Sequence, residues 1–158
     1  MKSVRRLLWI GTADIKDLYV RAGRSSKPLL AVLSDLVTAG VEVRLIHAKE
    51  PGPAFRTDFD KYPALIDGME RVLCPRVHFK LVVFDLQAAY VGSANLTGAG
   101  LGMKGENTRN FEAGVFSTNK AFVQSAVKLF DDVWMGAHCK TCKRKQFCAD
   151  PILNIQPV

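Results

Sequence analysis

Two strand-like stretches with a helix-like stretch between them place the strongest limit on how this chain can fold. Residues 6–10 are predicted to form a buried strand, apolar from Leu7 to Ile10, and residues 41–46 alternate between apolar and polar side chains. Between them, residues 28–39 carry leucines and a valine at helical spacing, and Gly40 follows as a helix-ending residue. A strand, a helix and a second strand in this order are typical of a crossover unit. The sequence therefore predicts an α/β sheet with helices on both faces.

The rest of the chain alternates between predicted strands and polar segments. Asn119 is predicted to cap a final helix, because apolar residues recur after it at helical spacing. The predicted strands are 77–84, 88–92 and 111–116, and the predicted surface loops are 48–62 and 98–110. We expect a single folded domain at residues 1–136, followed by a Cys-rich tail at 137–158.

Composition favours an anionic partner. The chain has 158 residues, about the size of one domain, with 22 Lys and Arg against 15 Asp and Glu, a formal charge of +7. Such an excess of positive charge favours nucleic acid above other partners. The apolar residues 7–10 are cut short by Gly11 and Thr12, which indicates a first strand and not a signal peptide. No apolar run approaches a membrane span, so we expect a soluble, cytoplasmic protein.

A histidine and a lysine stand two residues apart in the predicted strand 77–84. Because strand side chains alternate, His78 and Lys80 must project from the same face, where an imidazole and an ammonium group together suit a phosphate. A two-residue hairpin turn at 86–87 would place Lys80 opposite Ser93 and His78 opposite Asn95. The sequence thus predicts these four polar groups on one face of the sheet.

One string of residues resembles the signature of the phospholipase D superfamily. It consists of His78 and Lys80, then Asp85 after four intervening residues, and the Gly-Ser-Ala-Asn element at 92–95. The resemblance implies a phospholipase D-like mixed sheet and a phosphodiesterase that needs no metal ion for catalysis. It also implies that a neutral imidazole nitrogen of His78 attacks phosphorus and forms a covalent phosphohistidine.

The resemblance also suggests roles for the other residues of the predicted catalytic set. Lys80 and Asn95, assisted by Ser93, are expected to hold the non-bridging phosphate oxygens. Glu112 matches the acidic residue that family members place near the histidine, and we expect it to orient the imidazole ring. Asp85 completes the motif, and we expect it to close the turn or to pair with a cation.

The chain carries one copy of the motif, although a leaving oxygen must also be protonated. The other histidines, His47 and His138, do not begin a second copy. We therefore expect a homodimer whose active site lies at the two-fold interface, where one His78 attacks and its symmetry mate donates the proton.

The expected substrate is nucleic acid, DNA in particular, because short single-motif members of the resembled family are often nucleases. The alternatives are a phospholipid phosphodiesterase or phosphatidyl transferase, and a DNA-binding module that has lost its activity.

The cysteines suggest a metal site outside the catalytic motif. The tail contains a Cys-x-x-Cys pair and a third cysteine five residues after it, and a fourth cysteine lies just before the catalytic motif. A structural zinc ion or an iron–sulfur cluster is therefore expected. His138 or His47 is an alternative fourth ligand. The predicted ligands are Cys74, Cys139, Cys142 and Cys148.

Overall fold

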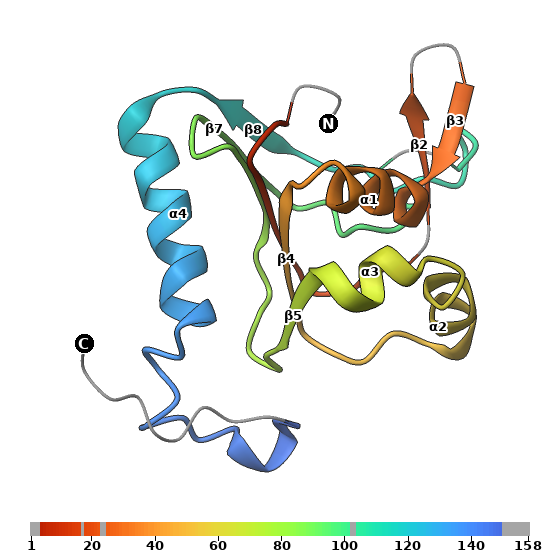
Figure 1. Cartoon of the computed structure of the whole chain (residues 1–158). Helices are drawn as coiled ribbons and strands as arrows, with labels where there is room; N and C mark the ends of the chain where they lie inside the picture. The colour runs from red at the N-terminus through yellow and green to blue at the C-terminus, as the bar shows by residue number, and fades with distance from the viewer. Residues whose placement is uncertain (1–3, 17, 23–24, 102–103, 150–158) are drawn as a thin grey trace.

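A six-stranded mixed sheet forms the centre of the structure, a computed structural model that describes residues 4–16, 18–22, 25–101 and 104–149 (Figure 1). The strand order is β5-β4-β1-β6-β7-β8. The first three strands in this order run parallel, and the next three continue antiparallel. The strands are β1 (Leu7–Thr12), β4 (Glu42–His47), β5 (Met69–Leu73), β6 (Lys80–Phe84), β7 (Ala88–Gly92) and β8 (Gly114–Ser117).

Helices cover both faces of this sheet, as the sequence predicts. On one face, α1 (Leu29–Thr38) and α3 (Pro63–Gly68) pack over β4 and β5, and on the other, α4 (Lys120–Trp134) packs over β6 and β7 (Figure 1). Each face has its own cluster of buried apolar side chains. In the described part of the chain, no helix is long and apolar enough to cross a membrane.

The helix boundaries follow the expected signals in most places. Asn119 caps α4, because its Oδ1 accepts a hydrogen bond from the backbone N–H of Phe122 at 3.1 Å. The prediction of a loop over 48–62 was wrong, since α2 (Pro53–Phe59) lies within it. Proline suits the first turn of a helix, where its missing N–H has no partner to lose, so Pro53 starts a helix here and does not break one.

Several strand boundaries also differ from the predictions. The strand predicted at 77–84 begins at Lys80, and the strand predicted at 111–116 begins at Gly114. Strand β5 and a small separate hairpin were not predicted. The hairpin comprises β2 (Tyr19–Ala22) and β3 (Ser25–Pro28), which lie between β1 and α1.

The turn between β6 and β7 corrects the predicted register. Phe84 pairs with Ala88 and Lys80 with Gly92, so the connection has three residues, and both predicted pairs, Lys80 with Ser93 and His78 with Asn95, are wrong by one position. Asp85 and Leu86 adopt positive φ angles of 52° and 57°, a conformation that aspartate tolerates better than most residues.

The Asp85 carboxylate holds this turn against the start of β1. It accepts hydrogen bonds from the backbone N–H groups of Arg5, Arg6 and Leu7 at 3.0, 2.8 and 3.0 Å. Desolvation acts to raise the pKa of Asp85, but the three N–H donors and the charge of Arg6 outweigh it, so the pKa lies below its usual value. The carboxylate is therefore structural, as the sequence analysis expects for its role.

We predict that Asp85→Ala lowers the free energy of unfolding by about 1–2 kcal/mol at neutral pH, because three N–H groups lose a charged acceptor. The folded-state pKa is lowered, so this contribution is present above the unfolded-state pKa and is lost as the pH falls through the folded-state pKa. Urea unfolding at neutral and at acid pH measures it. Asp67→Ala, which removes an exposed carboxylate of α3, is the control, and an equal loss for Asp85→Ala at both pH values would contradict the prediction.

Candidate active site

The predicted site residues gather at one end of the sheet, where β1 and β7 end and β6 and β8 begin. The register pairs Lys80 with Gly92, and Gly92 with Gly114. His78 precedes this row, Ser93 and Asn95 follow it on the neighbouring strand, and Glu112 lies just before β8. Asp85 follows the far end of β6, so the structure does not bring it to the other site residues.

His78 and Lys80 lie side by side, as their spacing predicts. The Lys80 Nζ is 3.4 Å from the His78 Nδ1 and donates a hydrogen bond to the His78 backbone oxygen at 2.9 Å. Lys80 is buried, with 8% of its surface exposed, whereas His78 is exposed. An ammonium group can only donate, so Nδ1 keeps its lone pair in this arrangement. The site thus presents an imidazole to solvent with a buried positive charge behind it.

The residues on either side of His78 anchor the segment that carries it. Val77 is buried, and Phe79 packs into the apolar cluster beneath α4. The Phe79 ring also crosses Gly11, where an added Cβ would lie 2.1 Å from Phe79 Cε2. Only glycine allows this close approach, so β1 and α4 together fix the backbone on both sides of the imidazole.

Hydrogen-bonding groups at the end of β1 and just after it orient the side chain of Asn95. Its Oδ1 accepts a hydrogen bond from the Asp14 N–H at 3.2 Å and lies 3.4 Å from the Thr12 Oγ1. Because a backbone N–H must point at the amide oxygen, the amide NH₂ is left to donate to another acceptor. Thr12 is buried and also accepts from the Leu96 N–H at 3.3 Å.

Thr12 therefore helps to position Asn95, a role that the sequence analysis missed. The available signal was a hydroxyl at the end of an apolar strand, where a buried polar group requires a hydrogen-bond partner.

Ser93 and Glu112 form a second cluster at the same end of the sheet. The Ser93 Oγ donates to Glu112 Oε2 at 2.5 Å, and the Asn110 Nδ2 donates to Glu112 Oε1 at 3.1 Å. These two bonds, together with the nearby charge of Lys80 and against desolvation, lower the pKa of the Glu112 carboxyl. Among the described residues its side-chain hydrogen-bond partners are Ser93 and Asn110 and not His78, so the predicted ring-orienting role stays a prediction.

Comparison with known proteins identifies the family. The family model described as "Cardiolipin synthase, PLD-like domain" matches residues 6–134. The chain belongs to the phospholipase D-like family. The matched range contains His78, Lys80, Ser93, Asn95 and Glu112, and it ends before the Cys-rich tail.

Solved structures share the phospholipase D-like fold at low sequence identity. NucT from Helicobacter pylori has a TM-score of 0.60 and 14% identity, over 84% of this chain and 80% of that chain. Nuc from Salmonella typhimurium, a phospholipase D family member, has a TM-score of 0.61 and 15% identity, over the same shares. TrmBL2, an archaeal chromatin protein, has a TM-score of 0.56 and 14% identity over 84% of this chain and 44% of its own. No curated protein sequence matches.

Membership gives the chain's chemistry at the level of the superfamily. Phospholipase D-like proteins are phosphodiesterases, and their catalysis is generally independent of metal ions. In chemical terms, an imidazole can act as a nucleophile, and ammonium and amide N–H groups can donate hydrogen bonds to phosphate oxygens.

The predicted metal centre in this phospholipase D-like chain is not formed. The four cysteines are free, and the described residues contain no group of three or more His, Cys, Asp or Glu side chains arranged to hold a metal ion. The tail nevertheless returns to the segment before His78, because the Cys148 Sγ lies 3.9 Å from the Leu73 oxygen.

Proposed function

We propose that this chain is a metal-independent nuclease that hydrolyses phosphodiester bonds, most of all in DNA, through a covalent phosphohistidine on His78. The observation that carries the proposal is the pairing of the exposed His78 imidazole with the buried Lys80 ammonium, 3.4 Å apart. A nucleophile and a fixed positive charge at this distance can act on one phosphate group.

In the first step, a neutral ring nitrogen of His78 forms a bond to phosphorus while the bond to the leaving oxygen breaks. Negative charge on the non-bridging oxygens is stabilised by Lys80, by the amide NH₂ of Asn95 and by the hydroxyl of Ser93. The Ser93 hydroxyl must first turn its proton away from Glu112, to which it donates in the structure. For Nε2 to attack, the ring proton must be on Nδ1. In the structure Nδ1 faces the Lys80 ammonium, which can only donate, so a hydrogen-bond acceptor must replace Lys80 beside Nδ1. The ionised Glu112 carboxylate supplies that acceptor in this proposal.

The leaving oxygen takes its proton from His78 of the partner subunit in a two-fold dimer. Within one chain the other histidines are unsuited to this role. His47 is buried, burial lowers its pKa, and its Nδ1–H donates to the Lys49 oxygen at 2.7 Å. His138 lines a separate hollow beside the tail. In the second step, water gives a proton to the now neutral imidazole of the partner and attacks phosphorus, which releases His78.

Nucleic acid is the proposed substrate because of the charge of the chain. The formal charge of +7 favours a polyanion, and phosphate contacts by basic residues supply sequence-independent affinity. A second candidate, a DNA-binding module without activity, is favoured by the likeness to TrmBL2, which is described as having a novel mode of DNA binding. The complete set of His78, Lys80 and Asn95 supports the nuclease. The tail and its three cysteines take no part in the proposed reaction.

Cleavage of single- and double-stranded DNA in excess EDTA tests the proposal. We expect the wild-type protein to cut at least one of the two substrates at an undiminished rate with chelator present. Salt-sensitive DNA binding without cleavage would favour the DNA-binding module. Hydrolysis of a phospholipid head group with no cleavage of DNA would replace the nuclease with a lipid phosphodiesterase.

A further inference from the structure

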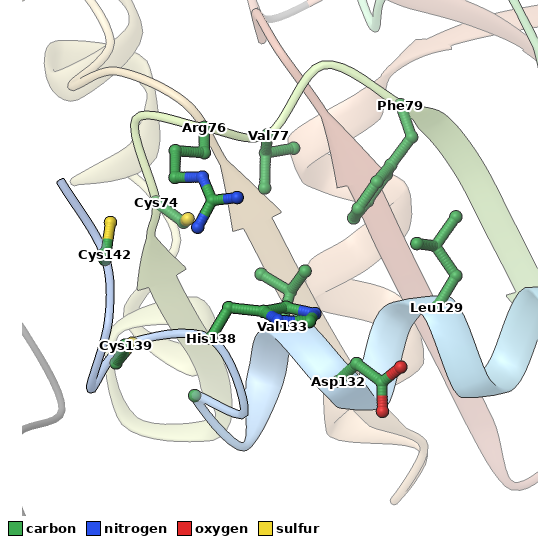
Figure 2. A pocket seen from close by; sticks show the side chains of 11 residues that line it. Cys74, Arg76, Val77, Phe79, Leu129, Asp132, Val133, His138, Cys139 and Cys142 are labelled. Atoms are coloured by element: carbon green, nitrogen blue, oxygen red, sulfur yellow. The ribbon is translucent and has the colours of Figure 1, made fainter. Parts of the chain in front are cut away.

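A hollow beside the tail brings together cysteines from two distant parts of the chain. It has a volume of about 210 Å³ and is bounded by the segment before β6, by the end of α4 and by the turn that follows α4 (Figure 2). Cys74 lines it from the first of these, and Cys139 and Cys142 line it from the tail. No residue of the proposed catalytic set lines this hollow.

The fourth cysteine approaches the same place from the far end of the tail. The Cys148 Sγ lies 3.9 Å from the oxygen of Leu73, the residue before Cys74. The chain has four cysteines in all, and each is a free thiol that is partly buried. All four therefore lie around residues 73–76, although Cys74 and Cys139 are 65 residues apart in the sequence.

The backbone after α4 is bent so that the tail turns back toward this segment. Gly136 ends the helix with a φ of 70°, and the N–H of Ala137 reaches back to the Asp132 oxygen at 2.9 Å. The Cys139 oxygen then accepts from the Cys142 N–H at 3.2 Å, which closes a tight turn between the two cysteines. A Cys-x-x-Cys turn of this kind is the usual way to present two thiolates to one metal ion.

The charges around the thiols match a metal–thiolate centre. Arg76 extends into the hollow that Cys74, Cys139 and Cys142 also line (Figure 2). The Arg144 N–H donates to the Cys142 Sγ at 3.4 Å. Four thiolates outweigh the charge of one divalent ion, so basic neighbours stabilise such a centre. Those in and beside the tail are Arg76, Lys140, Lys143, Arg144 and Lys145.

We propose that Cys74, Cys139, Cys142 and Cys148 bind one zinc ion as tetrahedral thiolate ligands. In the structure the four thiols do not converge on one point: Cys74, Cys139 and Cys142 line the hollow together with Arg76, and Cys148 lies beside Leu73. Binding requires the four side chains to turn inward and the Arg76 guanidinium to move outward, where it still faces the negatively charged centre. The ligand spacing and the closeness of all four cysteines to residues 73–76 carry the proposal.

The consequence is a clamp on the segment that carries His78. Val77 and Phe79, the residues on either side of the histidine, line the same hollow as the cysteines. A zinc ion shared by Cys74 and the tail would therefore fix both the tail and the backbone that leads to the imidazole. This role is structural and does not depend on the proposed reaction.

Metal content and thiol reactivity test the proposal without any activity assay. The wild-type chain, purified with a reductant and without chelator, is expected to retain about one zinc ion per chain, with all four thiols protected from alkylation until the metal is removed. Cobalt substitution is expected to give the visible bands of a tetrahedral thiolate site. Cys148→Ala is expected to lose the metal, and Ser125→Ala, an exposed position on α4, is the matched control that keeps it.

Cys148→His covers the case in which the alanine variant fails to fold, because imidazole is also a zinc ligand. This variant is expected to bind cobalt with shifted bands. Four freely reactive thiols in a metal-free wild-type chain would overturn the proposal, and so would a disulfide between Cys139 and Cys142 in the reduced preparation. Iron with acid-labile sulfide in anaerobically purified protein would overturn zinc as the bound metal.

Discussion

Replacing His78 with alanine is expected to lower the rate of DNA cleavage by at least about a thousandfold, because the proposed covalent intermediate forms on this imidazole ring. The substitution removes the ring and keeps the backbone oxygen that accepts from Lys80. His78 is exposed, so the free energy of unfolding should change by less than about 0.5 kcal/mol. The measurement is the single-turnover rate in excess EDTA, together with urea unfolding of both proteins.

The control for this substitution is Gln124→Ala, which removes an exposed polar side chain from α4 and leaves the strand ends untouched. It is expected to cleave DNA at the wild-type rate. A His78→Ala protein that is folded and still cleaves within tenfold of the wild type would remove the phosphohistidine from the mechanism. Cleavage would then have to come from another nucleophile or from a contaminating nuclease.

The layers of the fold could be predicted because they depend on local periodicity. The apolar spacing of α1 and the apolar run of β1 are properties of short windows, and such windows determine which face of an element is buried. Asn119 could likewise be assigned as a cap, since its partner, the N–H of Phe122, is only three residues away. Features that depend only on residues close in sequence, such as the buried faces of α1 and β1 and the Asn119 cap, were thus correctly predicted.

The register of the β6–β7 hairpin could not be predicted in the same way. The turn depends on the Asp85 carboxylate, whose hydrogen-bond partners Arg5, Arg6 and Leu7 are 78 to 80 residues away in the sequence. From the local sequence, Leu86 and Gln87 were predicted to form a two-residue turn, which pairs each residue of β6 one position away from its partner in the structure. A shift of one residue exchanges the two faces of a strand. The error concerned which residues pair and not which end of the sheet they occupy.

In the candidate site too, features that depend on sequence neighbours could be predicted and features that depend on distant residues could not. His78 and Lys80 are two residues apart, so their closeness could be predicted from local sequence, although β6 begins only at Lys80. The orientation of Asn95 depends on Thr12 and Asp14, which are more than eighty residues away, and no local pattern indicates them. The sequence therefore predicted which polar groups lie together at this end of the sheet and missed the residues that orient them.

Mixing wild-type and His78→Ala subunits is expected to lower the activity of each wild-type chain in proportion to the excess of the variant. If both imidazoles of a dimer are needed, only dimers of two wild-type subunits are active, so a ninefold excess of the variant lowers activity per wild-type chain by about tenfold. The subunits are unfolded together and refolded to allow exchange, and cleavage is then measured at constant wild-type concentration.

The same proteins combined just before the assay, without refolding, serve as the control and should retain full activity. The dependence on mixing separates a shared site from the alternatives, because an active monomer or two independent sites in a dimer would both keep the activity of each wild-type chain constant. A constant value would therefore remove the partner's imidazole as the proton donor. Within one chain His47 is buried with a lowered pKa and His138 lines a separate hollow, so the proton would then have to come from the solvent.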